Sequence, residues 1–224
     1  MAADRAQART DYDLVIFDCD GVLVDSEKLS CTCLMELLRK HGIDVGLDVI
    51  FEKFLGRSIS AVADHFRELG RLMPTSFPIE LQQRVRNSFT ESLHRVAGIE
   101  SVLQGLDIDY CVASSSDLER VNFTLGLAGL SGQFAGRVFT AEMVKRGKPA
   151  PDLFLHAASS MAVRPERTLV IEDSVTGVQA GKAAGMTVWG FVGGSHYASR
   201  DGRALLVAAG ADRVFDRMAD FWRH

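Results

Sequence analysis

Short apolar runs recur along this chain, and each of them ends in small or polar residues. They are too short for typical helices and rich in β-branched or aromatic residues, as strands are; the runs are Leu14–Phe17, Tyr110–Ala113, Val138–Phe139, Thr168–Ile171 and Val188–Val192. Because the runs are apolar on both faces, we expect buried strands of a parallel sheet. Helical patterns lie between them, over Leu118–Leu127, Asp152–Met161 and Val175–Ala184. This alternation predicts an α/β fold with an open, doubly wound, Rossmann-like sheet.

One stretch, residues 26–96, breaks this alternation because it holds no convincing buried strand. Apolar residues recur there at helical spacing, and the helical patterns cover Glu27–His41, Ile59–Leu69 and Ile79–Val96. We therefore predict two units. Residues 11–25 and 97–224 form an α/β core domain, and residues 26–96 form an α-helical domain inserted after the first strand.

The bulk properties of the chain limit its partners. Its 224 residues are 47% hydrophobic and 24% charged, so a core of ordinary size needs no disulfides. A net charge of −4 and the lack of a Lys/Arg-rich run argue against a nucleic acid partner. No apolar run reaches the roughly 18 residues of a membrane span, and the four cysteines match neither a disulfide framework nor a zinc knuckle. We expect a cytoplasmic protein without a membrane partner, either a monomer or a weak homodimer.

Polar residues gather just after the predicted strands, where open α/β sheets bind their ligands. The first group is Asp18, Asp20 and Gly21, which follow Leu14–Phe17. Two carboxylates two residues apart point roughly the same way, and they repel one another unless a cation neutralises them. Mg²⁺ prefers such oxygen ligands, and Gly21 permits an unusual turn or a close backbone approach. The alternative is an ordinary turn, in which Asp and Gly are common.

Hydroxyl groups and a lysine form the second and third groups. Ser114, Ser115 and Ser116 follow a predicted strand, and they would either cradle a phosphate or form a polar loop into the next helix. Lys148 stands in the string Gly-Lys-Pro-Ala-Pro-Asp, whose two prolines restrict the backbone around it. A lone lysine is usually a solvated surface residue, but a lysine within this string is not expected to be one.

The fourth group consists of two adjacent acids, Glu172 and Asp173, directly after a buried strand. Clustered acids are costly without a cation, although they could instead cap the helix that follows. Ser174 is positioned to orient them, as residues behind metal ligands do.

These four motifs, in this order, resemble those of the haloacid dehalogenase superfamily. The first of them, Asp18-x-Asp20-Gly-Val-Leu-Val-Asp-Ser, is similar to the branch that holds phosphoglycolate phosphatases, sugar-phosphate phosphatases and β-phosphoglucomutase. The resemblance covers essentially the whole chain. It implies that residues 26–96 form the α-helical cap that closes over the site and selects the substrate.

The resemblance implies a catalytic role for three of these residues. Asp18 would be the nucleophile that becomes an aspartyl-phosphate, and Asp20 would be the general acid/base. Lys148 would neutralise the nucleophile and the transferring phosphoryl group. Phosphate and substrate would bind to Gly21, Ser114, Ser115 and two cap residues, Glu27 and Arg57.

The same resemblance implies that Mg²⁺ is the cofactor. Its ligands would be Asp18, the backbone carbonyl of Asp20, Asp173 and, directly or through water, Glu172. An ionised carboxylate beside this ion could attack phosphorus.

The function that we expect is Mg²⁺-dependent hydrolysis of a small phosphorylated metabolite, a sugar phosphate or sugar-acid phosphate. A β-phosphoglucomutase-like mutase is the main alternative; that branch carries His ten residues after the acid/base Asp and Arg three residues after a cap glycine, where this chain has Ser30 and Ile59. A binding module without catalysis is a more distant alternative. His196 and Tyr197 are expected at the rim of the site.

Overall fold

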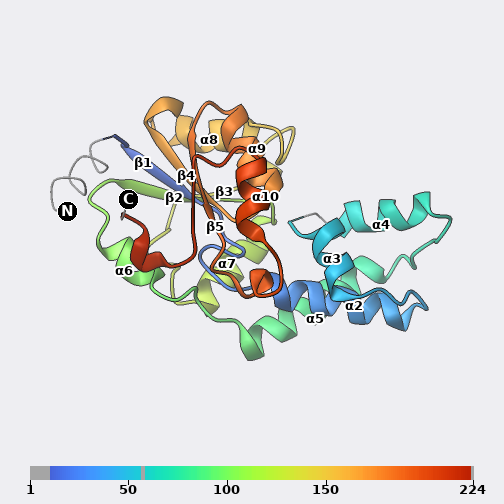
Figure 1. Cartoon of the computed structure of the whole chain (residues 1–224). Helices are drawn as coiled ribbons and strands as arrows, with labels where there is room; N and C mark the ends of the chain where they lie inside the picture. The colour runs from blue at the N-terminus through green and yellow to red at the C-terminus, as the bar shows by residue number, and fades with distance from the viewer. Residues whose placement is uncertain (1–10, 57–58, 223–224) are drawn as a thin grey trace.

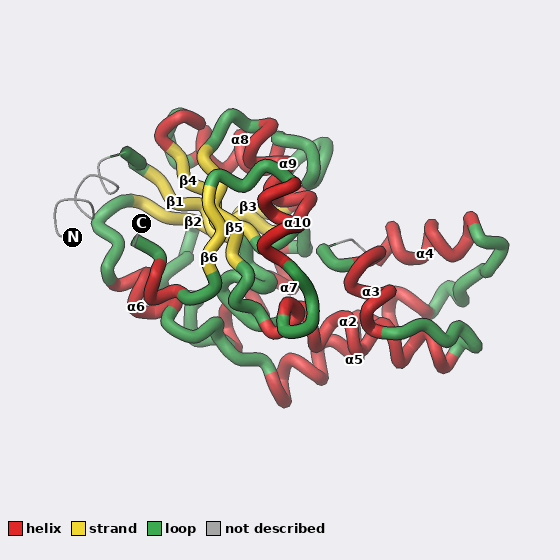
Figure 2. Tube along the Cα trace, in the orientation of Figure 1, coloured by secondary structure: helices red, strands yellow, loops and turns green. Residues whose placement is uncertain are grey.

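A computed structural model describes residues 11–56 and 59–222 and contains one six-stranded sheet (Figures 1 and 2). All neighbouring strands pair in parallel, in the order β3-β2-β1-β4-β5-β6. The strands are β1 (Leu14–Phe17), β2 (Asp109–Ser114), β3 (Val138–Thr140), β4 (Thr168–Glu172), β5 (Thr187–Phe191) and β6 (Arg213–Phe215). The predicted parallel α/β sheet is therefore confirmed.

Helices cover both faces of the sheet, as the apolar character of the strands requires (Figure 1). Leu14 and Ile16 point to one face and Val15 and Phe17 to the other, and they belong to two separate hydrophobic clusters. One face packs against α8 (Asp152–Ser160), α9 (Val175–Ala183) and α10 (Gly202–Ala208). The other packs against α6 (Ile99–Gln104) and α7 (Leu118–Leu127).

The stretch between β1 and α6 is helical, as predicted. Its helices are α2 (Glu27–Lys40), α3 (Leu47–Phe54), α4 (Ile59–Glu68) and α5 (Phe77–Ser92). Their apolar faces form a third hydrophobic cluster, distinct from the two that flank the sheet. In Figure 1 these helices extend to one side of the sheet, with α4 farthest from it. A separate core agrees with a cap at residues 26–96, and the domain boundaries stay a prediction.

Several elements lie outside the sequence-based prediction. They are α3, α6, α10 and β6. β6 is only three residues long and begins with Arg213, so it has no apolar run to detect. The four cysteines are free and buried, as expected. Within residues 11–56 and 59–222, no helix is long and apolar enough to span a membrane.

The strand order positions the site. β1 pairs with β2 on one side and with β4 on the other, so the topology switches direction around β1. Phe17 lies in register with Val112 of β2 and with Ile171 of β4. The residues just beyond these three positions therefore lie close together at the carboxyl edge of the sheet.

Candidate active site

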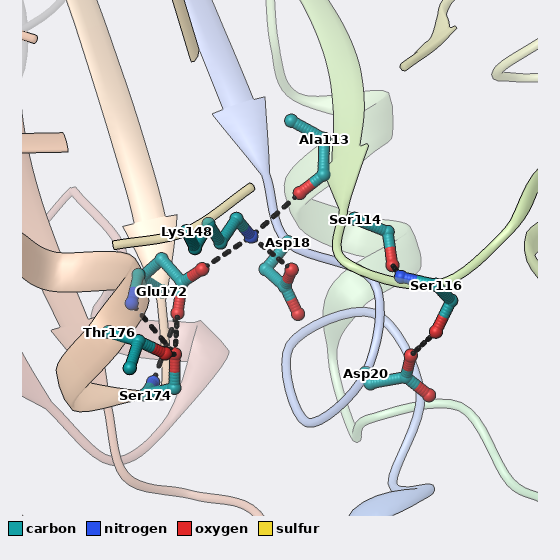
Figure 3. Close-up of polar contacts among 10 residues, drawn as sticks. Asp18, Asp20, Ala113, Ser114, Ser116, Lys148, Glu172, Ser174 and Thr176 are labelled. Atoms are coloured by element: carbon teal, nitrogen blue, oxygen red, sulfur yellow. Dashed lines mark hydrogen bonds and ion pairs between the residues drawn. The ribbon is translucent and has the colours of Figure 1, made fainter. Parts of the chain in front are cut away.

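Lys148 joins the ends of three strands at this edge (Figure 3). Its ammonium nitrogen Nζ donates to Asp18 Oδ1 at 2.6 Å, to Glu172 Oε1 at 2.6 Å and to the carbonyl oxygen of Ala113 at 2.9 Å. The Lys148 side chain is only 2% exposed. All three of its N–H donors are therefore used, and its charge lies between two buried carboxylates.

Opposing effects act on the pKa values of Asp18 and Lys148. Burial raises the pKa of Asp18 to about 7, although the Lys148 charge lowers it. The nearby carboxylates of Glu172 and Asp20 act in the same direction as burial. The two carboxylates in turn raise the pKa of Lys148 against the effect of its own burial. Lys148 therefore stays charged, and a further cation beside Asp18 would favour its ionised form.

Asp20 faces a different set of partners. Its Oδ1 accepts from Ser26 Oγ at 2.6 Å and from Arg120 Nη2 at 3.4 Å, and its Oδ2 accepts from Ser116 Oγ at 3.1 Å. Burial would raise the pKa of Asp20, but Arg120 and the two serine hydroxyls outweigh burial and lower it. Asp18 and Asp20, two residues apart in the sequence, thus have distinct environments: burial dominates at Asp18, and hydrogen-bonded partners dominate at Asp20.

Both carboxylate oxygens of Glu172 accept hydrogen bonds. One of its oxygens accepts from Lys148, and Oε2 accepts from the Ser174 backbone N at 3.0 Å and from Ser174 Oγ at 2.9 Å. Ser174 also caps α9, because its Oγ accepts from the backbone N of Gly177 at 3.0 Å. A Cβ at Gly177 would lie 1.8 Å from Glu172 Cδ, so the glycine is needed for this close approach.

Asp173 is buried, and its carboxylate oxygen Oδ2 has no hydrogen-bond partner. The nearest base is His196, whose Nε2 lies 3.2 Å from Oδ2 without the geometry of a hydrogen bond. Gly21 has a φ of +81°, and a Cβ there would lie 1.7 Å from Oδ2. Burial and the charges of Glu27 and Glu172 raise the pKa of Asp173.

The opposite side of the site is formed by helices of residues 26–96, the stretch predicted as the cap. A cavity of about 710 Å³ opens above the carboxyl edge of the sheet. Core residues Asp18, Ser114, Ser115, Lys148 and Asp173 line it together with Glu27, Ser30 and Ile59 from the stretch predicted as the cap. Burial and the charge of Asp20 raise the pKa of Glu27 to about 8. The structure thus brings together every predicted site residue except Gly21, which lies beside Asp173, and Arg57, which lies outside the described residues.

Sequence reasoning missed the role of Arg120, and it misplaced two other residues. Arg120 on α7 contacts Asp20 from 100 positions away, and nothing in its local sequence distinguishes it from a solvated helix residue. His196 and Tyr197 are buried rather than at the rim. The Tyr197 hydroxyl donates to the backbone carbonyl of Asp173.

The carboxylates at this edge are suitable ligands for a divalent cation. Within residues 11–56 and 59–222, no group of three or more His, Cys, Asp or Glu side chains is arranged to hold a metal ion. The ligand set implied by the resemblance, however, needs only Asp18, Asp173 and a backbone carbonyl. Asp173 offers a buried oxygen that lacks a partner, and such an acceptor is costly unless a cation or a donor reaches it. The residues present therefore fit Mg²⁺.

Comparison with known proteins identifies the class. Residues 15–191 match the family model of haloacid dehalogenase-like hydrolases, so the chain belongs to this family. The resemblance inferred from the four motifs is thereby confirmed.

Individual relatives narrow this class. The chain is 30% identical to the 6-phosphogluconate phosphatase of Escherichia coli, over 82% of this chain and 84% of that protein. It is also 30% identical to a phosphorylated carbohydrates phosphatase of Thermotoga maritima, over 88% and 91% of the two chains. A solved hydrolase of the family from Deinococcus radiodurans, with bound phosphate and sodium, is 33% identical with a TM-score of 0.76, over 94% and 93%. The family and these relatives support the expected enzyme class, a phosphoric monoester hydrolase.

Proposed function

We propose that this hydrolase is a Mg²⁺-dependent phosphatase that acts on a small phosphorylated sugar or sugar acid through an aspartyl-phosphate on Asp18. The observation that carries the proposal is the position of Lys148, whose ammonium lies 2.6 Å from both Asp18 and Glu172. A cation fixed beside a nucleophile can stabilise the charge of a transferring phosphoryl group without any rearrangement. The cavity above it has room for the rest of a metabolite.

In the first step, a carboxylate oxygen of Asp18 bonds to phosphorus and the bond from phosphorus to the ester oxygen breaks. The charge of Lys148 offsets that of the phosphoryl group, and the hydroxyl of Ser114 binds a phosphoryl oxygen. The leaving oxygen takes a proton from Asp20, which lines the same cavity. Ser26 and Ser116 each bond to one oxygen of Asp20 and so set the plane of its carboxyl group.

In the second step, water attacks the phosphorus of the aspartyl-phosphate. Asp20 removes a proton from this water, the new oxygen bonds to phosphorus, and the bond from phosphorus to Asp18 breaks. Inorganic phosphate leaves, and Asp20 has regained the proton that it donated in the first step. The charge of Arg120 holds the pKa of Asp20 low in this structure, so the proton-carrying role of Asp20 requires that this contact weaken when substrate binds.

The metal would be held by Asp18, by the backbone carbonyl of Asp20 and by Asp173. When bound, Mg²⁺ offsets the negative charge that the nucleophile and the phosphoryl group bring together. Both oxygens of Glu172 already accept hydrogen bonds, so we propose that Glu172 acts on the metal through water and on Lys148 directly. Gly21 lets the first motif approach Asp173 closely.

A sugar phosphate or sugar-acid phosphate is the proposed substrate class. The two phosphatase relatives act, by their names, on 6-phosphogluconate and on phosphorylated carbohydrates. Glu27 and Ser30 bring polar groups into the cavity, and these could bind hydroxyl groups of a sugar. Arg57 remains a candidate for the same role.

Mutase activity is the second candidate, and two residues weigh against it. A mutase must bind a bisphosphate in two orientations and exclude water, which calls for cations on the cap. Ser30 is engaged as an acceptor for Arg120 at 3.2 Å, and Ile59 presents an apolar side chain to the cavity. Incubation with β-glucose 1-phosphate and a trace of glucose 1,6-bisphosphate separates the candidates. Glucose 6-phosphate formed without inorganic phosphate would reverse the assignment.

The phosphatase proposal is tested with p-nitrophenyl phosphate, then with a panel of phosphorylated sugars and sugar acids. We expect turnover with Mg²⁺, no turnover in EDTA and recovery when Mg²⁺ is restored; full activity in excess chelator would contradict the metal role. Asp18→Asn should abolish turnover, and a fluoroberyllate phosphoryl mimic should attach its beryllium to Asp18 in the wild type. Asp109→Asn, at a side chain that is 63% exposed, is the matched control and should retain activity. A protein without activity toward any phosphate ester would instead be a binding module.

A further inference from the structure

Arg120 is a partly buried cation that lines the cavity, and none of the four motifs contains it. It lies on α7, and its guanidinium carbon is 5.2 Å from the centre of the Phe89 ring of α5. Its Nη2 donates to Asp20 Oδ1 at 3.4 Å and to Ser30 Oγ at 3.2 Å. The side chain thus spans from the proposed acid/base residue on the core to α2 on the cap side.

The hydrogen-bonding capacity of Arg120 is largely unused. Its Nε is buried and has no hydrogen-bond partner, and both bonds of Nη2 are long for N–H to oxygen. An arginine side chain carries five N–H donors in a planar fork that suits a carboxylate. Because the Arg120 side chain is 26% exposed and lines the cavity, the N–H groups on its cavity side can take an oxygen ligand from outside the chain.

The other cations that line the cavity are already engaged. Among the described residues, these are Lys148, whose three donors are used, and Arg86. Arg86 is half-exposed and donates to Glu119 at 3.3 Å. Lys148 serves the phosphate end of the site, and Arg120, 26% exposed against 49% for Arg86, is the better shielded of the other two cations, so it is the one best placed to bind the remainder of a substrate.

We propose that Arg120 is a specificity-determining residue that binds the carboxylate of a sugar-acid phosphate. The inference rests on the proposed phosphatase function and deepens it. Arg120 already holds one carboxylate, that of Asp20, by a single long contact. A substrate carboxylate that engages two N–H groups on the cavity side of the guanidinium makes two charge-assisted bonds and replaces that contact. Asp20 then keeps its bonds to Ser26 and Ser116 and faces the ester oxygen without the guanidinium.

The test compares two substrates that share a six-carbon skeleton and a 6-phosphate. 6-Phosphogluconate has a carboxylate at its first carbon, and glucose 6-phosphate has none. The wild type should prefer 6-phosphogluconate in kcat/KM. Arg120→Met should lower this parameter at least tenfold more for 6-phosphogluconate than for glucose 6-phosphate, mainly by raising KM, as the loss of a charged hydrogen bond implies.

Two further variants distinguish a binding role from a structural one. Arg120→Lys retains the charge without the planar fork and should restore part of the preference. Arg39→Met replaces an exposed arginine of α2 and should leave the preference intact. Equal losses on the two substrates would overturn the proposal, because Arg120 would then act only on Asp20 or on the fold. A wild type without preference for the acid would overturn it as well.

Binding without turnover separates this proposal from the proposed function. Calorimetry on Asp18→Asn protein should show weaker 6-phosphogluconate binding when Arg120→Met is added, by at least tenfold more than for inorganic phosphate. Unequal weakening supports the Arg120 site even if the wild type hydrolyses no ester. Active enzyme with equal weakening of the two ligands would refute the Arg120 site and leave the phosphatase function standing.

Discussion

Replacement of Lys148 by methionine should destabilise this protein strongly. Lys148 is 2% exposed and pairs with two carboxylates at 2.6 Å, and the Asp18 and Glu172 side chains are only 10% and 1% exposed. Methionine keeps much of the apolar stem and removes the charge, together with the contact that Lys148 Nζ makes with the Phe154 ring at 4.9 Å from its centre. Removal of one partner of a buried ion pair leaves uncompensated charge and costs about 3–5 kcal/mol of unfolding free energy.

The destabilisation caused by Lys148→Met should become larger as pH rises. Burial raises the pKa of Asp18 in the metal-free folded state to about 7, above its value in the unfolded chain. A raised carboxyl pKa means that the folded state binds more protons, so stability falls as pH rises toward that pKa. Without Lys148 the pKa of Asp18 rises further, and the variant goes on losing stability above pH 7 after the wild type has levelled off. The gap between them should widen from pH 7 to pH 9 by as much as ~2–3 kcal/mol.

Urea unfolding in EDTA, followed by far-UV circular dichroism at pH 6, 7 and 9, measures this gap. Lys182→Met is the matched control, because Lys182 pairs with Asp212 at 2.6 Å with both side chains more than a third exposed. That surface pair should contribute no more than about 1 kcal/mol. Mg²⁺ should narrow the Lys148→Met gap by placing a second cation beside Asp18. A Lys148→Met variant no less stable than Lys182→Met, or a gap that narrows as pH rises, would refute the reasoning.

Two further predictions concern neighbouring residues. Gly21→Ala places a Cβ 1.7 Å from Asp173 Oδ2 at a φ of +81°. The variant should therefore displace Asp173 and weaken Mg²⁺ binding, measured by calorimetry, at least ~10-fold. An unchanged affinity for Mg²⁺ would mean that Asp173 is not a ligand of the metal. Burial raises the pKa of Glu27 to about 8, so wild type should lose stability relative to Glu27→Gln between pH 5 and pH 8. The loss of unfolding free energy should be about 1–3 kcal/mol in metal-free urea titrations, a range kept low because Glu27 is partly exposed to solvent. If the stabilities of the wild type and of Glu27→Gln change in parallel with pH, Glu27 ionises normally.

The four groups of site residues could be recognised from the sequence because their spacing is local. Asp18 and Asp20 are two residues apart, and Glu172 directly precedes Asp173, so a strand end brings each pair to one edge of the sheet. The parallel character of the sheet follows from short runs that are apolar on both faces, whereas the pairing of β1 with both β2 and β4 was seen only in the structure. The expected convergence of Lys148 on Asp18 depended on the family resemblance, since 130 residues separate the two.

The environment of each group was decided only by the tertiary structure. Asp20 and Arg120 are 100 positions apart, and their contact depends on how α7 packs against the sheet and the cap helices. The residues beside Asp173 come from two distant segments: Gly21 follows β1, and His196 and Tyr197 lie on one turn after β5.

Local sequence patterns determined most of the elements of this protein, the parallel character of its sheet and the residue types that gather at the carboxyl edge of the sheet. They did so because the period of a strand or helix and the chemistry of a short motif are both written within a few residues. The tertiary structure alone decided which carboxylate is paired, which donor is left without a partner and which cation faces the cavity. Charge and hydrogen bonding in a buried site depend on burial and on contacts between distant segments, and no local spacing encodes either of these.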